Sequence, residues 1–232
     1  FAVPMRHRPA GSTEAYPSAP VLLTPTAEAP EVAAPGEEDA VAGALAGAAT
    51  STSAHSAVDA AAHGPLSMYA LAEGAGWVLG PLALARTLHP QPPAPDPRPG
   101  TRVAVEGDGP GTGFPLEQRT LIAESALRTM GLTEGFAPLV LLCGHGSTTT
   151  ANAHAAALDC GACGGNRGGP NARAAAAIFN DPDVRQELAE RGIDIPDSTR
   201  FVAGEHDTAT DQVVVFDDET LGPDHQSVLT TL

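Results

Sequence analysis

The chain of 232 residues contains no lysine, so all 12 of its Lys and Arg positions are arginine. Against them stand 28 acidic residues, which give a formal net charge of −16 at pH 7. A nucleic-acid-binding protein needs a basic surface to contact phosphates, and anionic lipid headgroups attract basic segments. The charge balance therefore argues against nucleic acid as a partner and against a general attraction to anionic lipid surfaces.

Long hydrophobic runs are also missing. A membrane-spanning helix needs about 18 or more consecutive apolar residues, and the sequence has no such run. Only 3 cysteines are present. They stand among glycines in a loop-like context, which favours a reducing compartment and metal binding over disulfides.

All the cysteines lie in residues 136–173, FAPLVLLCGHGSTTTANAHAAALDCGACGGNRGGPNAR. An apolar run over residues 138–142 leads into Cys143-Gly-His145-Gly. Such a run ending at glycine is typical of a buried strand followed by a loop. Because open α/β sheets build their sites at the carboxyl ends of strands, we expect a site here.

Thiolate and imidazole are favoured zinc ligands, and a structural site holds four of them in a tetrahedron. Cys143, His145, Cys160 and Cys163 could form such a set. Cys143, at the end of the apolar run, is interpreted as a buried small hydrophobe, and Cys163 is open between ligand and loop packing. His145 and Cys160 are the main candidates because neighbouring glycines let backbone approach an ion closely.

The stretch CGHGSTTTANAHAAALDCGACGGNRGGPNAR resembles the signature of the DabA family. The resemblance continues in IFNDPDVRQELAERGIDIPDSTRFVAGEHDTATDQVVVFD, in GFPLEQRTLIAESALRTMGLTEGFAPLV and in VPMRHRPAGSTEAYPSAPVLLTP. Members of this family resemble β-type carbonic anhydrases around the metal, and they act as the zinc subunit of an energy-coupled inorganic carbon uptake complex. The resemblance covers most of the chain, apart from about residues 26–66.

The resemblance implies zinc ligation by His145 and Cys160. The family's other two ligands, a cysteine and an aspartate, belong to a C-x-D-x-R motif that this sequence lacks. In the family that motif shortly precedes a stretch like the one that begins at Val3. We therefore expect the chain to be a C-terminal fragment that holds half of the zinc site and is inactive alone.

The expected activity is hydration of CO2 to bicarbonate. Zinc lowers the pKa of a bound water to about 7, and the zinc-bound hydroxide attacks CO2. The resemblance also implies a membrane-embedded, proton- or cation-translocating partner (DabB-like). The subunit is accordingly expected to be a peripheral protein on the cytoplasmic face of the cell membrane.

Further residues are candidates to orient the ligands or to hold substrate: Asp159, Cys163, Asn166, Arg167 and His206. Asp159 precedes Cys160 and is placed to hydrogen-bond a ligand or backbone. Asn166 and Arg167 are placed to hold bicarbonate or the loop itself. His206 and, more weakly, His154 are candidates for proton transfer.

The predicted fold is α/β, with a mainly parallel sheet, flanking helices and a β-carbonic-anhydrase-like arrangement around the metal. We divide the chain into an N-terminal strand and loop segment (1–25), a flexible, acidic, alanine-rich insertion (26–65) and the zinc-site domain (66–232). The insertion is interpreted as flexible because alanine buries too little area to offset the entropy of ordering.

Capping residues and hydrophobic periodicity predict the regular elements. Helices are expected over 66–88, from Pro115 to a C-terminal cap at Gly131, over 170–180, and from an N-terminal cap at Asp181 to Gly192. Strands are expected over 21–23, 102–105, 138–142, 200–203 and 212–216.

One alternative function stays open from the residues alone. Cys143, His145, Cys160 and Cys163 could close a structural zinc site that only holds loops together. A serine hydrolase is not supported because the G-x-S-x-G motif is absent. A phosphate-binding P-loop is not supported because that motif requires lysine.

Overall fold

The structure is a computed structural model, and it describes residues 2–20, 23, 25, 27–46, 73–74, 76–77, 80–81, 84, 88, 100–107, 113–148, 155–217 and 221–230. The chain divides into two compact units, one of Phe1–Glu37 with Pro97–Leu232 and one of Glu38–Asp96. In the second unit residues 38–46 are helical. Most of the strand predicted at 21–23 and most of the helix predicted at 66–88 lie outside the described residues.

The N-terminal sheet has the strand order β2-β1-β3-β4. Its strands are β1 (Met5–Arg8), β2 (Tyr16–Ser18), β3 (Ala27–Ala33) and β4 (Thr101–Val103). β1 and β3 are parallel, whereas the β1–β2 and β3–β4 pairs are antiparallel. This sheet is therefore mixed.

The second sheet has the order β5-β6-β7 and comprises β5 (Leu139–Gly146), β6 (Arg200–Asp207) and β7 (Gln212–Phe216). β5 and β6 are parallel, and β6 and β7 are antiparallel. The prediction of a mainly parallel sheet is wrong. β6 extends through Asp207, so only the turn 208–211 connects it to β7. A parallel pair needs a connection of a dozen or more residues, so this short turn makes β7 antiparallel to β6.

The insertion does not begin at residue 26, because Ala27–Ala33 forms β3 in the middle of a sheet. Ala27 and Ala29 are buried, and Glu28 pairs with Arg8 on β1 at 2.5 Å. Main-chain pairing with strands on both sides orders this segment despite its small side chains. Such pairing joins residues that are far apart in the sequence, so the amino-acid composition of the segment does not reveal it.

The helices of the first unit are α3 (Leu116–Met130), α4 (Ala155–Leu158), the 3₁₀ helix η1 (Gly161–Cys163), α5 (Gly169–Asn180), α6 (Pro182–Glu190) and α7 (Pro223–Leu229). The three helices α3, α5 and α6 follow the predicted signals closely, whereas α4, η1 and α7 were not predicted. Gly131 ends α3 in the left-handed region with φ 71°, as predicted. The Asp181 carboxylate accepts hydrogen bonds from the N–H groups of Asp183 and Val184, which confirms it as the N-terminal cap of α6.

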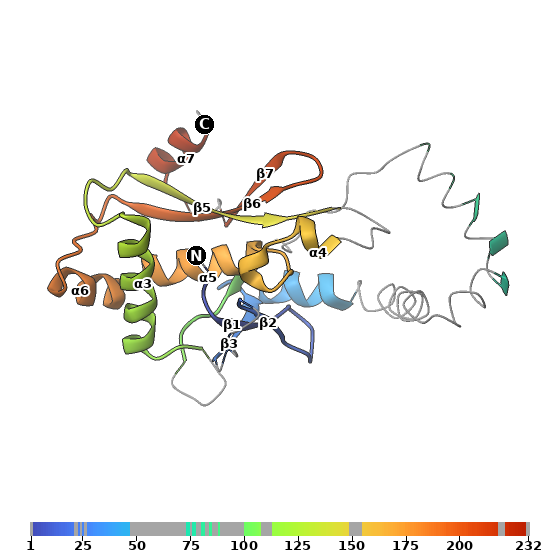
Figure 1. Cartoon of the computed structure of the whole chain (residues 1–232), viewed down its shortest axis with the longest axis horizontal. Coiled ribbons are helices and arrows are strands. Elements are labelled where there is room, and N and C mark those ends of the chain that lie inside the picture. Colours follow the sequence, from blue (N-terminus) through green and yellow to red (C-terminus); the bar gives the residue numbers. More distant parts are fainter. Residues whose placement is uncertain are drawn as a thin grey trace. The chain divides into compact units, whose positions relative to one another are not determined.

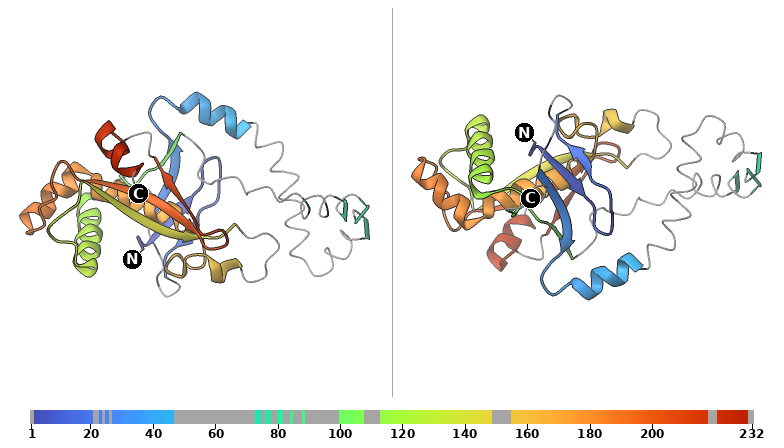
Figure 2. Two further views of the ribbon diagram at one scale, coloured as in Figure 1. Left: turned by 90° about the horizontal axis from the view of Figure 1, so that it is seen from above. Right: turned by 90° about the horizontal axis from the view of Figure 1, so that it is seen from below.

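Helix α5 lies between the two sheets (Figures 1 and 2). On one side Phe179 packs edge-on against Phe201 of β6, with ring centroids 5.1 Å apart. On the other side the Asn171 side chain bonds both the N–H and the carbonyl of Val3, each at 2.8 Å. The N–H of Gly168, just before α5, donates to the carbonyl of His145 at 2.7 Å. The N-terminal end of α5 therefore lies close to the end of β5, which is where the sequence places the site.

Candidate metal centre

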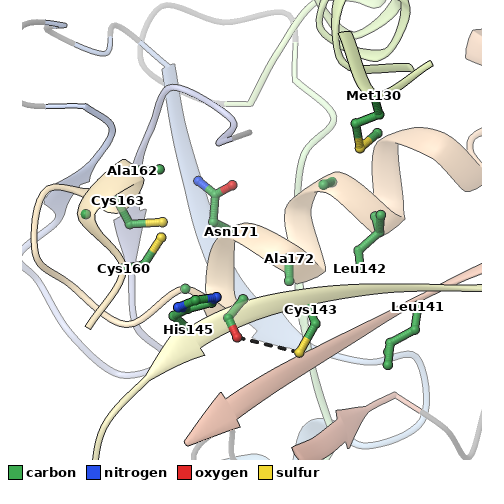
Figure 3. Close-up of a pocket in the computed structure, with 14 residues that line it drawn as sticks. Met130, Leu141, Leu142, Cys143, His145, Cys160, Ala162, Cys163, Asn171 and Ala172 are labelled. Carbon is green, nitrogen blue, oxygen red and sulfur yellow. Dashed lines mark hydrogen bonds between the residues drawn. The ribbon is translucent and has the colours of Figure 1, made fainter. Parts of the chain in front are cut away.

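A cavity of about 480 Å³ brings the predicted donors together (Figure 3). It is lined by Met130, Leu141, Leu142, Cys143, Gly144, His145, Cys160, Gly161, Ala162, Cys163, Gly168, Asn171, Ala172 and Ala175. His145 and Cys160 reach this cavity from separate elements, β5 and the loop before η1. The CGHG and CGAC segments therefore line one cavity, and the assignment of His145 and Cys160 as metal donors stays a prediction.

His145 lies near the carboxyl end of β5, directly opposite His206 of β6 in the parallel register. The two imidazole rings meet edge to face, with centroids 6.1 Å apart. His206 Nε2 lies 2.7 Å from Oδ1 of Asp211, whose side chain is 96% exposed. The structure thus places a second imidazole beside His145 and links it to a solvent-exposed carboxylate.

Cys160 and Cys163 occupy one tight loop. The N–H of Cys163 donates to the carbonyl of Cys160 at 3.0 Å, and Cys160 and Asn166 form an isolated bridge. The Asn166 side chain donates to the carbonyls of Pro17 and Cys163, both at 3.0 Å. These hydrogen bonds tie the loop to β2. Asn166 therefore holds the loop, which is one of the two roles considered for it.

The environments of the cysteines differ. Cys163 is buried, and burial together with a hydrogen bond to Cys160 raises the pKa of its thiol to about 12. Cys143 is exposed, so its interpretation as a buried small hydrophobe is wrong. Leu141, Cys143 and His145 alternate on the exposed face of β5, whereas Val140 and Leu142 on the other face pack against the core. Which face of an apolar run is covered depends on tertiary packing, which the run itself does not reveal.

Arg167 is held by Glu205 of β6, a residue that sequence reasoning missed. Arg167 Nε donates to Glu205 Oε1 at 2.9 Å, and the N–H of Gly169 donates to Oε2 at 2.8 Å. The Glu205 side chain is only 4% exposed. A methyl group on Gly146 would lie 2.5 Å from the Glu205 carboxyl carbon, so glycine leaves the space that this carboxylate fills. Glu205 therefore anchors the cysteine loop to the second sheet.

Two further carboxylates, those of Asp159 and Asp207, lie in this part of the fold. The pKa of Asp159 is raised by burial. A backbone hydrogen bond at Ser147 and the charge of Arg167 act in the opposite direction but do not cancel this rise. Burial would also raise the pKa of Asp207, but hydrogen bonds from Thr148 and backbone N–H groups lower it overall. Asp207 also accepts from the N–H of Ala209 at 2.8 Å, so it fastens the segment after β5 to the turn after β6.

The donor types fit zinc, but the set is incomplete. His145, Cys160 and Cys163 bring imidazole and thiol groups to the lining of one cavity, which is the chemistry that zinc prefers. In the portion of the chain that the structure describes, no three His, Cys, Asp or Glu side chains converge as a metal site requires. The closed four-ligand arrangement is therefore not assembled here, and the described residues provide a partial donor set.

We expect Gly144→Ala to damage this site. A methyl group at Gly144 would lie 2.5 Å from the carbonyl carbon of Gly168, and it would disrupt the 2.7 Å hydrogen bond from the Gly168 N–H to the His145 carbonyl. Overpacking of this kind costs about 1–3 kcal/mol. Gly161→Ala is the matched control, because it lines the same cavity and its methyl group would meet nothing within 4 Å. Denaturant unfolding of both variants measures the difference, and equal stabilities would contradict the close contact.

Comparison with known families accounts for the whole chain. The model of a family described as "Probable inorganic carbon transporter subunit DabA" matches residues 1–232. The chain belongs to the DabA family. The resemblance seen in the CGHG and CGAC segments is thereby confirmed.

Curated DabA relatives are substantially longer than the part that this chain matches. A probable inorganic carbon transporter subunit DabA from Novosphingobium aromaticivorans is 41% identical over 97% of this chain and 28% of its own length. The one from Chloroflexus aurantiacus is 39% identical over 100% of this chain and 29% of its length. A Bradyrhizobium relative named DabA 2 is 56% identical over 53% of this chain and 15% of its length.

No solved structure matches this DabA-family chain. The β-carbonic-anhydrase-like arrangement therefore stays a prediction. A search of the described residues for membrane spans finds no helix that combines the length and the apolar character needed to cross a bilayer.

Proposed function

We propose that this chain is a zinc-binding part of an inorganic carbon transporter subunit, in which CO2 is hydrated to bicarbonate, with His145 and Cys160 as zinc donors. The observation that carries the proposal is that both residues line one cavity, which they reach from separate elements. Membership of the DabA family supports the role in inorganic carbon transport.

The cavity suits the proposed substrate. Zinc held by His145 and Cys160 would supply Lewis-acid chemistry and lower the pKa of a coordinated water. The apolar side chains of Leu142 and Ala172 line the same cavity, and an apolar lining with few polar groups accommodates a small apolar molecule such as CO2. His206, beside His145, is placed to accept a proton and to pass it to Asp211 at the surface.

The described part of the chain does not assemble a complete set of metal donors. We infer that further donors, a cysteine and an aspartate of a C-x-D-x-R motif, join His145 and Cys160 in the whole protein. Relatives that match nearly the whole chain leave about 70% of their own length outside the match. That additional length can contain the further zinc donors.

A partner protein is part of the proposal. The curated relatives are named as subunits of a transporter, which supports assembly into a complex. We propose that the partner is a membrane-embedded, proton- or cation-translocating protein (DabB-like) and that this subunit is peripheral, on the cytoplasmic face of the membrane.

The test uses a chimera, called here the graft, in which this chain replaces the segment that it matches in the Novosphingobium aromaticivorans relative. The graft is expressed with its partner subunit in a bacterium that lacks carbonic anhydrase, and uptake of labelled inorganic carbon is measured. We expect His145→Ala and Cys160→Ser to abolish uptake, whereas Cys143→Ser in the same graft retains it. Full uptake by both ligand variants would refute the proposed roles.

A further inference from the structure

Cys160 and Cys163 stand at the two ends of a single turn. The N–H groups of Cys163 and Gly165 both donate to the carbonyl of Cys160, at 3.0 and 3.1 Å. A turn closed in this way keeps the Cα atoms of its first and fourth residues within about 7 Å, and disulfides span Cα distances of about 4.4–6.8 Å. The backbone therefore already has a spacing that a disulfide can bridge.

The side chains are arranged accordingly. Figure 3 shows the sulfur atoms of Cys160 and Cys163 facing each other. The Cys143 thiol is directed instead to the carbonyl of Gly144 at 3.7 Å. All three cysteines are free thiols. We propose that Cys160 and Cys163 form a reversible disulfide, a modification site distinct from the use of Cys160 as a metal donor.

The cavity gives an oxidant access to this pair. Both residues line it, but Cys163 is only 2% exposed, whereas Cys160 is half-buried. With a peroxide as oxidant, the Cys160 sulfur attacks one peroxide oxygen, the O–O bond breaks, and a sulfenic acid and one water result. The Cys163 sulfur then attacks the sulfenic sulfur, the S–S bond forms, the S–O bond breaks, and a second water leaves. The two thiols lose two hydrogens in total, and the peroxide is reduced to two waters.

The disulfide bears directly on the metal. A thiolate is the form of cysteine that binds metals, so a sulfur in a disulfide is withdrawn from the donor set. If the proposed function holds, oxidation of this pair removes one zinc donor and reduction restores it. The disulfide itself needs no metal, so its formation can be tested separately from the zinc site.

The test treats the reduced, zinc-free 232-residue chain with hydrogen peroxide and maps the product by peptide mass spectrometry before and after a dithiol reductant. We expect an intrachain link between Cys160 and Cys163, with the loss of two hydrogens and full reversal. Cys143→Ser should retain this product. Cys163→Ser should lose it and leave Cys160 as a sulfenic or more oxidised acid.

Other products would overturn the inference. Peroxide treatment that leaves the pair unlinked, or that links Cys143 to either partner, means that Cys160 and Cys163 do not form the site. A second arm repeats the treatment on the graft, in which the donor set is proposed to be complete, and there excess zinc added before the peroxide should slow formation of the link. A link that forms at an unchanged rate in zinc would support the modification site and count against Cys160 as a zinc donor, so the two ideas fail separately.

Discussion

Cys160→Ser is expected to lower the zinc affinity of the graft by about 100-fold or more, because even the hydrogen-bonding partners of metal ligands are worth about 10–100-fold. Cys160 lines the cavity beside His145 and lies in the loop that Asn166 ties to β2. Competition with a chromophoric zinc chelator measures the change. Cys143→Ser is the matched control, and we expect it to leave the affinity unchanged, because Cys143 is exposed and its thiol is directed to the Gly144 carbonyl.

Equal losses of zinc affinity in the Cys143, Cys160 and Cys163 variants would contradict this choice of donors. They would indicate a closed site in which all three cysteines join His145, and the structural zinc module would then be the better interpretation. Retention of full affinity in Cys160→Ser would remove this residue from the donor set altogether.

Arg173→Leu is expected to destabilise the fold by about 3–5 kcal/mol, the usual effect of breaking a buried ion pair from one side. The guanidinium is only 3% exposed and bonds Glu31 at 2.9 Å and Asp217 at 2.8 Å. It thereby joins α5 to β3 and to the end of β7. Its loss leaves the Glu31 carboxylate, 7% exposed, without this charge partner. Arg191→Leu, which removes surface pairs only, should destabilise the fold far less, because solvent screens exposed ion pairs. Denaturant unfolding compares the two variants.

The pH dependence of stability tests the same ion pair independently. Burial would raise the pKa of Glu31, but hydrogen bonds from Thr101 and Ala10 and the charge of Arg173 lower it below its ordinary value of 4.5. A carboxyl whose pKa is lower in the folded state stabilises the fold above the unfolded pKa, and this contribution is lost as the pH falls through the folded pKa. Stability should therefore fall on acidification below about pH 4.5, and less steeply in Glu31→Gln. Parallel pH profiles for the two proteins would contradict this assignment.

The elements that sequence analysis predicted well are those with local signals. The glycine cap at Gly131 and the aspartate cap at Asp181 act on neighbouring backbone groups, and both lie where they were expected. The metal-donor candidates were likewise identified from short motifs around His145 and Cys160. Their meeting in one cavity follows from placing the loop before α5 at the carboxyl end of β5.

The features that were missed depend on contacts between distant residues. Glu205 is 38 positions from Arg167, and nothing around Glu205 in the sequence indicates that partner. β3 is ordered by pairing with β1 and β4, of which β4 begins only at Thr101. The exposure of Cys143 follows from its place on the face of β5 opposite the one that packs against the core. Each of these outcomes is decided by tertiary packing, which periodicity and composition do not encode.

Zinc content per protein, measured side by side in the 232-residue chain and in the graft, tests the central claim most directly. The account predicts about one tightly held zinc ion in the graft and much weaker binding by the chain alone, since a tetrahedral site needs more donors than His145 and Cys160. Stoichiometric, tight zinc in the 232-residue chain alone would contradict this, because Cys143 or Cys163 would then complete a local site.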